Sequence, residues 1–305
     1  MNKTFKFFDN LPSGRASDKI TEGCLVLEGG AWKGLYTVGV LDAMMENDLN
    51  FRKVTGCSAG ALSAIGYLAG QIGWGIRIDL SCRHDGKYIG LDAYRRDKGI
   101  TGFSYLFRDV VKERPLDKHR LNDPSRQLAV SATNLKTGKL TYFEKGKCSL
   151  SKAIQASATV PYVSAPVMIK GEPYLDGGCA EKIPYSWAKE SGEKKIVVVL
   201  TREKSYRRKE GVSPAARLIY GRYPEFVDSL AHTNARFNAM MDELEEREQK
   251  GEIFIIAPSK PVNVSRFEGD IDKLSTLYWL GYYDAYEAVP ALREYLNSQS
   301  CPDDV

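Results

Sequence analysis

Two short segments constrain the fold of this chain most strongly, because each is a predicted strand that runs into a glycine turn and then a helix. The strands are expected at residues 24–27 and 51–55, and the helical patterns that follow cover residues 32–47 and 59–69. A strand–helix–strand–helix order favours a parallel sheet with right-handed crossover connections. The sequence therefore predicts an α/β fold built on a parallel sheet.

Ser58 is the centre of the second turn, which has the G-x-S-x-G pattern of a nucleophile elbow. Glycines near the serine let the backbone bend without a Cβ clash, so its hydroxyl can point out of the turn. The structural alternative is a glycine-rich turn that only packs a helix closely on a strand. The strand before the turn and the helix of small residues after it favour the nucleophile. The elbow consists of Gly56, Cys57, Ser58, Ala59 and Gly60.

The first turn, residues 29–34, would line up backbone N–H groups at a helix start, where negative charge is favoured. It lacks the G-K-[ST] ending of a phosphate loop. It also fails the dinucleotide-binding pattern, because the second strand leads into the elbow and offers no ribose-binding acid. A nucleophile and an anion-binding turn close together in sequence indicate acyl transfer.

The usual catalytic triad is poorly supported by the three histidines of the chain, His84, His119 and His232. In α/β-hydrolases the order along the chain is serine, acid, histidine. His84 and His119 precede any suitable acid in that order. His232 falls on the polar side of a predicted amphipathic helix at residues 226–250. An α/β-hydrolase that uses His232 stays open as one alternative.

A third segment, Asp176-Gly177-Gly178, would by itself be an ordinary turn. Together with the two glycine turns, however, it resembles the three motifs of the patatin-like phospholipase family, in the same order. Residues 24–200 resemble the catalytic domain of that family, and the remainder resembles the C-terminal extension of a bacterial patatin-like subfamily. The resemblance implies a three-layer α/β/α fold with a mostly parallel central sheet and a mixed, mainly helical C-terminal extension.

The resemblance also implies a Ser–Asp dyad, in which Ser58 forms an acyl-enzyme and Asp176 acts as general base. An ordinary aspartate with a pKa near ~3.9 is a weak base. Such a site therefore depends on stabilisation of the oxyanion, which is worth roughly 3–4 kcal/mol per donor in serine hydrolases. The resemblance assigns this task to backbone N–H groups of the first turn, at Gly30, Ala31 and Trp32. The whole oxyanion motif comprises Gly29, Gly30, Ala31, Trp32, Lys33 and Gly34.

Two positions in these motifs invite a further expectation. The family often has a third glycine where this chain has Ala31, so we expect a slightly different shape of the oxyanion turn. Lys33 occupies the basic position of the motif, and we favour a supporting role in the loop.

Cys57 and Cys179 would lie beside the two dyad residues, and we expect small space-filling thiols rather than a redox pair.

The chain is expected to have three parts: an N-terminal arm at residues 1–21, a catalytic domain at 22–202 and an extension at 203–305 packed on that domain. Short helices and loops are expected over residues 70–122, in a region that often covers the site of a hydrolase. Further strands are predicted at residues 127–132, 139–144, 196–200 and 253–257, with a hairpin pair at 167–175. Helices are predicted at residues 151–157, 182–191 and 226–250, and the chain ends in a tyrosine-rich helical stretch.

Composition narrows the partners and the compartment. The net charge of +4 is small for 305 residues and does not indicate nucleic-acid binding. The six cysteines have no C-x-x-C pair, which favours reduced thiols. No signal peptide is expected within residues 1–20, and the longest apolar run, residues 196–200, is far short of a membrane span. We therefore expect a cytoplasmic protein without metal or cofactor.

The expected activity is hydrolysis of acyl esters of lipids, with a lipid or other acyl ester as the partner. One alternative is a soluble carboxylesterase or thioesterase, and another is a non-catalytic acyl- or lipid-binding protein with the same fold. Peripheral membrane contact through the basic loop at residues 202–209 stays open beside a solvated loop, which is favoured. The sequence indicates no oligomeric state.

Overall fold

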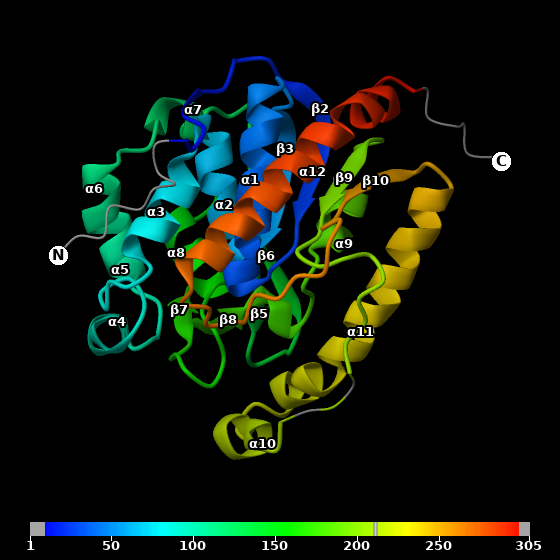
Figure 1. Ribbon diagram of the computed structural model, residues 1–305. Helices are drawn as coiled ribbons and strands as arrows, with labels where there is room; N and C mark the ends of the chain where they lie inside the picture. The colour runs from blue at the N-terminus through cyan, green and yellow to red at the C-terminus, as the bar shows by residue number, and fades with distance from the viewer. Residues whose placement is uncertain (1–9, 210, 212, 299–305) are drawn as a thin grey trace.

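The computed structural model describes residues 10–209, 211 and 213–298. Its centre is an eight-stranded mixed sheet (Figure 1). Its parallel part has the strand order β10 (Ile253–Ile256), β9 (Ile196–Val199), β2 (Thr21–Leu27), β3 (Phe51–Cys57) and β5 (Gln127–Asn134). Antiparallel pairing then adds β8 (Glu172–Asp176), β7 (Val167–Ile169) and β6 (Leu140–Glu144). The predicted α/β class with a mostly parallel sheet is confirmed.

Helices cover both faces of this sheet. Side chains alternate along β2, so that Leu25 and Leu27 pack in one core while Cys24 and Val26 pack in another. The first core contains α1 (Gly34–Glu46), α2 (Ala59–Leu68) and α12 (Ile271–Asn297), and the second contains α9 (Tyr185–Glu190) and α11 (Pro224–Gln249). The expected three-layer α/β/α arrangement is therefore present (Figure 1).

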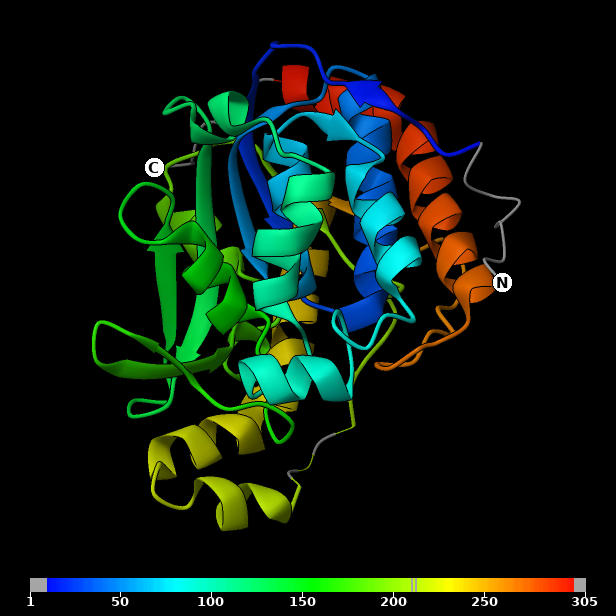
Figure 2. The same cartoon turned by 90° about the vertical axis from the view of Figure 1, so that its left-hand side faces the viewer.

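Short helices fill the segment between α2 and β5, as the sequence predicts for residues 70–122. Among them, α3 and α7 pack against α2, and the group lies on the face that Figure 2 shows. They are α3 (Trp74–Cys82), α4 (Leu91–Asp97), α5 (Phe103–Tyr105), η2 (Leu106–Val110), α6 (Val111–Glu113) and α7 (Lys118–Asn122). Near the N-terminus, β1 (Gly14–Arg15) pairs with β4 (Gln71–Ile72), so part of the expected arm is tied to this segment. Residues 1–9 of that arm lie outside the described residues.

The C-terminal segment completes the sheet and the core. β10 lies in register beside β9 at the edge of the sheet, and α12 packs along α1 (Figure 1). The two helices approach closely at Gly39 and Gly281, where an added Cβ would collide with the facing backbone. The hydroxyl of Tyr278 donates to the buried carboxylate of Asp42 at 2.8 Å. The division of the chain at residue 202 stays a prediction, because the sheet and core run across it.

Two helices differ from the sequence expectation. The predicted helix over residues 182–191 begins only at Tyr185, because Pro184 lacks an N–H and suits the position just before or at a helix start. A short helix that the sequence did not predict, α10 (Ala215–Tyr220), precedes α11.

Among the described residues, none of the helices has both the length and the apolar composition that a membrane crossing requires.

Candidate active site

Ser58 lies at the sharp turn between β3 and α2, with φ of 53° and ψ of −118°. This left-handed conformation is costly for a residue with a Cβ, by about 1–3 kcal/mol, and persists only where the surroundings impose it. The backbone N–H of Ser58 donates to the hydroxyl of Ser157 at 2.8 Å. Gly56 permits the tight packing of the turn, because a Cβ there would lie 2.7 Å from the backbone nitrogen of Ala61. The structure thus holds the serine in the geometry of a nucleophile elbow.

Strand register brings Asp176 to this turn. Parallel β3 and β5 pair Cys57 with Ser131, and antiparallel β5 and β8 pair Ala132 with Asp176. The ends of β3 and β8 therefore meet across β5. There the hydroxyl of Ser58 donates to Oδ2 of Asp176 at 2.7 Å.

The surroundings of Asp176 fix its carboxylate and change its basicity. Its Oδ1 accepts a hydrogen bond from the N–H of Gly178 at 2.8 Å, in the 3-10 turn η3 (Gly177–Cys179). Burial raises the pKa of Asp176, although hydrogen bonds from Ser58 and Gly178 and the charges of Lys182 and Arg266 act in the opposite direction. A carboxylate with a raised pKa is a stronger base than an ordinary aspartate.

The first glycine turn lies beside Ser58 and leads through η1 (Ala31–Lys33) into α1. Gly29 donates its N–H to the carbonyl of Lys182, and Lys33 donates to the carbonyl of Gly30. Within the described part of the chain, the N–H groups of Gly30, Ala31 and Trp32 donate to no protein acceptor. Three backbone donors are therefore available next to the serine.

Ala31 has φ of 50°, so it takes the left-handed conformation that a glycine would adopt freely. The turn keeps this conformation despite the alanine. Gly34 brings the turn against the elbow, because a Cβ there would lie 2.6 Å from the Cβ of Ala59. The two glycine turns thus form one tightly packed unit.

Sequence reasoning missed Glu28, which directly precedes the first glycine turn and fixes its start through hydrogen bonds. Its side chain is fully buried, and its Oε2 accepts hydrogen bonds from the N–H of Thr201 at 2.6 Å and from its hydroxyl at 2.9 Å. Burial raises the pKa of Glu28. The available signal was a charged residue at the end of an apolar strand, immediately before two glycines. The contact ties the end of β2 to the residues that follow β9.

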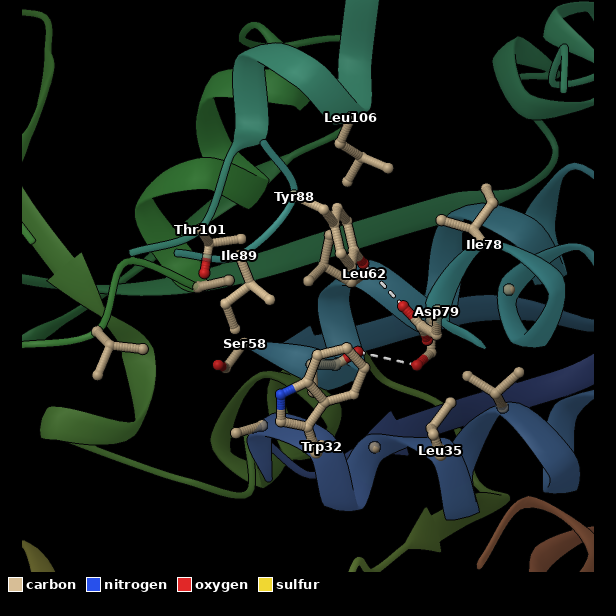
Figure 3. A pocket seen from close by; sticks show the side chains of 18 of the residues that line it. Trp32, Leu35, Ser58, Leu62, Ile78, Asp79, Tyr88, Ile89, Thr101 and Leu106 are labelled. Atoms are coloured by element: carbon tan, nitrogen blue, oxygen red, sulfur yellow. Dashed lines mark hydrogen bonds between the residues drawn. The ribbon is translucent and has the colours of Figure 1, made fainter. Parts of the chain in front are cut away.

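An apolar cavity of about 130 Å³ begins at Ser58 and extends between α1, α2 and α3 (Figure 3). Its wall is formed mainly by aliphatic and aromatic side chains, including Trp32, Leu35, Leu62, Ile78, Ile89 and Leu106. The carboxylate of Asp79 also lines it and accepts a hydrogen bond from the hydroxyl of Tyr88 at 2.7 Å. Such a cavity suits a hydrocarbon chain.

A second, larger cavity of about 390 Å³ extends from Ser58 and Asp176 toward α11 and the loop after β9. It shares Ala31, Ser58, Val160 and Arg266 with the apolar cavity. Its wall is polar and carries several basic side chains. The serine therefore lies where an apolar and a polar cavity meet.

The remaining candidates are the histidines, which lie outside the two cavities, and Cys57 and Cys179, which lie beside Asp176. His232 projects from α11 with its side chain 60% exposed, and its Nδ1 faces the carboxylate of Asp228 at 3.3 Å. None of the three histidines is among the described residues that line the two cavities. Cys57 and Cys179 are free and buried, and burial raises the pKa of both thiols. No group of three or more histidine, cysteine or acidic side chains in the described segments could hold a metal ion.

Comparison with known proteins identifies the chain at the level of the family. The family model of patatin-like phospholipases matches residues 25–188, more than half of the chain, and a model described as a domain of unknown function matches residues 223–297. The uncharacterized protein YjjU of Escherichia coli K12 is 26% identical over 264 residues, which cover 84% of this chain and 74% of YjjU.

Two further comparisons lie at greater distance. The probable lipid hydrolase 463L of Invertebrate iridescent virus 6 is 24% identical over 212 residues, which cover 60% of this chain and 71% of the viral protein. Among solved structures, VipD of Legionella pneumophila aligns over 92% of this chain and 68% of its own, at 15% identity and a TM-score of 0.46. From the family match, which spans the elbow, the oxyanion turn and Asp176, the chain belongs to the patatin-like phospholipase family.

Proposed function

We propose that the protein is a lipid acyl hydrolase that cleaves an acyl ester through a Ser58 acyl-enzyme, with Asp176 as general base. The observation that carries the proposal is the 2.7 Å hydrogen bond between the hydroxyl of Ser58 and the carboxylate of Asp176. Family membership and the printed description of a viral relative as a probable lipid hydrolase support a lipid ester as substrate. The apolar cavity that starts at Ser58 supports an acyl chain of substantial length.

The geometry supports a two-step mechanism. Oγ of Ser58 attacks the ester carbonyl carbon and transfers its proton to Oδ2 of Asp176, while the carbonyl electron pair moves onto its oxygen. The N–H groups of Gly30, Ala31 and Trp32 then stabilise this oxyanion. Collapse of the tetrahedral intermediate expels the alcohol, which takes the proton from Asp176. The product of the first step is an acyl ester of Ser58.

Water completes the reaction. A water molecule transfers a proton to Asp176 as its oxygen attacks the acyl carbon, and the same N–H groups stabilise the second oxyanion. The bond to Oγ of Ser58 then breaks, and Oγ recovers the proton from Asp176. The fatty acid leaves and the enzyme returns to its starting state. No metal takes part in these steps, so we expect turnover to persist in the presence of a chelator.

Access of a lipid requires a surface that contacts the aggregate, and we assign this role to α10 and α4 rather than to the basic loop. Within that loop, Lys204 pairs with Glu248 of α11, and Arg207 pairs with Asp242. Arg202 and Arg208 line the polar cavity. Four of the five basic side chains of the loop thus face acids of α11 or the cavity, which leaves mainly the exposed Lys209 for a membrane.

Four exposed apolar side chains lie instead on two helices at one end of the molecule, while others lie elsewhere, for example on α12. Leu218 and Ile219 of α10 are 88% and 49% exposed, and Leu91 and Tyr94 of α4 are 64% and 54% exposed. In Figure 2 these two helices lie at the same end of the molecule. Arg217 is also exposed on α10, which suits contact with an anionic lipid surface.

The activity is tested with a series of p-nitrophenyl esters of increasing chain length, as monomers and as micelles, on the wild type and on Ser58→Ala. We expect kcat/KM to rise with chain length as the apolar cavity fills, and Ser58→Ala to be inactive. A maximum at the shortest esters would favour the soluble esterase. A folded wild type that is inert throughout the series would favour the non-catalytic lipid-binding protein.

A further inference from the structure

The polar cavity beside Ser58 is lined by five basic side chains that come from separate parts of the chain. They are Lys33 of the oxyanion turn, Lys182 after η3, Arg202 and Arg208 of the loop after β9, and Arg266 before α12. Asp176 is the one acidic residue among the described residues of its wall. The cavity thus concentrates positive charge at the point where an ester would react.

Protein contacts hold two of these arginines in place. The backbone of Arg208 exchanges hydrogen bonds with the side chain of Asn238, at 2.7 and 2.9 Å, and its guanidinium lies over the ring of Phe237 at 4.6 Å. The guanidinium of Arg202 lies over Tyr206 at 4.6 Å and donates to the carbonyl of Val262 at 2.6 Å. These side chains are therefore positioned before any ligand binds.

Two of the hydrogen-bond donors of these arginines lack acceptors. The Nε atoms of Arg202 and Arg208 are both buried, and neither has a hydrogen-bond acceptor among the described residues. The nearby acid Glu28 accepts hydrogen bonds from Thr201 through Oε2, and its Oε1 has no hydrogen-bond donor among the described residues. A buried donor without an acceptor is costly, and because these two arginines also line the cavity, an acceptor of a bound ligand can complete them.

Mutual repulsion among the cations is visible at Lys33. Burial lowers the pKa of Lys33 to about 8, and the charges of Arg202, Arg208 and Arg266 act in the same direction, whereas the charge of Glu28 opposes them. Burial also lowers the pKa of Lys182 and of Arg208. An anion bound between these groups would relieve the repulsion.

We propose that this cavity binds a phosphate group of the lipid substrate, while the acyl chain enters the apolar cavity on the other side of Ser58. Arginine guanidinium groups are suited to phosphate because their N–H donors match its oxygens in pairs. The proposal rests on the proposed function and specifies the substrate class: a lipid whose anionic phosphate lies close to the cleaved ester. Among the described residues of the wall, a quaternary ammonium head group would meet only the carboxylate of Asp176 as a counter-charge, so phosphates without a cationic head group are favoured.

Most of the site that we propose lies outside the region that the family model matches. Arg202, Arg208 and Arg266 all follow residue 188, where that match ends. The oxyanion turn and the dyad lie inside it. Residues after position 188 therefore contribute three of the five basic side chains of this cavity, in addition to β10 and the core helix α12.

The test uses two substrates with the same acyl chain and the same ester, 1-lauroylglycerol and its 3-phosphate. We expect the wild type to have at least a tenfold higher kcat/KM for the phosphate. Arg208→Gln lowers this preference about tenfold, and Arg208→Lys restores part of it. The matched control is Arg207→Gln, a neighbouring change of the same charge at a side chain that faces α11, and it keeps the wild-type preference.

A second arm separates a head group from free phosphate. Glycerol 3-phosphate is expected to inhibit hydrolysis of 1-lauroylglycerol competitively, and this inhibition weakens in Arg208→Gln. Inorganic phosphate that changes the rate without competing with the substrate would overturn the head-group assignment, because the cavity would then bind a free regulatory anion.

The outcomes distinguish this inference from the proposed function. Equal kcat/KM for the two substrates in the wild type, or equal losses for both in Arg208→Gln, would overturn the phosphate subsite and leave the hydrolase intact. A folded wild type that cleaves neither substrate and does not react with a fluorophosphonate would overturn the hydrolase itself.

Discussion

The hydroxyl of Ser58 and the carboxylate of Asp176 lie 2.7 Å apart although 118 positions separate them in the chain. Two strand registers produce this contact, because β5 pairs with β3 on one side and with β8 on the other. The contact lies where the apolar cavity, the polar cavity and three backbone N–H donors meet. Each part of this arrangement leads to a separate measurement.

The acid limb of the pH–rate profile reports on Asp176. Burial raises the pKa of this carboxyl group, and a protonated carboxyl cannot accept the proton of Ser58. We therefore expect kcat/KM to fall as the pH decreases, with a midpoint above the ~3.9 of an ordinary aspartate. The profile is measured with a neutral soluble ester, so that the substrate does not titrate. A rate that stays constant down to the ordinary aspartate pKa would argue against this base.

The alkaline limb is expected to depend on the substrate. Lys33, with a pKa of about 8, carries its charge below that pH and loses it above. For a lysophospholipid KM should therefore rise above pH 8, whereas KM for the neutral ester of the same chain length should not. Lys33→Met should remove the difference in pH dependence between the two substrates. An identical alkaline profile for both substrates in the wild type would show that Lys33 does not contact the phosphate.

The close packing of α12 on α1 predicts a large effect at Gly281. A Cβ at this position would collide with the backbone carbonyl of Tyr36. Gly281→Ala should therefore reduce the free energy of unfolding by about 1–3 kcal/mol, in spite of the better helix propensity of alanine. Urea denaturation measures the loss, and Glu287→Ala at an exposed position of the same helix serves as the control. Equal stability of the two variants would contradict the observed helix packing.

The exposed apolar face of α10 predicts an effect on membrane binding. Leu218 is 88% exposed, so Leu218→Asp should leave folding and hydrolysis of monomeric esters unchanged. Sedimentation with vesicles that contain an anionic phospholipid should show at least fivefold weaker binding. Glu225→Asp near the start of α11 is a mild control that should bind as the wild type does. Unchanged binding of Leu218→Asp would place the membrane contact elsewhere.

The strands and most helices were predictable because their patterns are local. The short apolar runs of β2 and β9 and the small-residue segment of α2 each specify the element through their length, composition and flanking glycines. The contact of Ser58 with Asp176 came from the resemblance between motifs, because no local pattern specifies which strand lies beside β5. The sequence alone also gave no reason to place β10 next to β9.

The basic lining of the polar cavity was not predictable, because most of its residues come from irregular segments. Arg202 and Arg208 lie in an irregular loop, where no periodicity indicates which side chains point inward. The sequence favoured a solvated loop, with membrane contact as the alternative. Arg266 gave no signal because its partners lie far away in the chain. Glu28 is similar, since only its contact with Thr201 explains a buried carboxylate before two glycines.

The most direct measurement of the central claim is labelling with an alkyl fluorophosphonate, read by intact mass. Oγ of Ser58 displaces fluoride from phosphorus and transfers its proton to Asp176, so the wild type should gain one adduct. Ser58→Ala should gain none, and Asp176→Asn should react about 10²–10³-fold more slowly. A folded wild type that gains no adduct, or a Ser58→Ala variant that is labelled like the wild type, would contradict an activated Ser58.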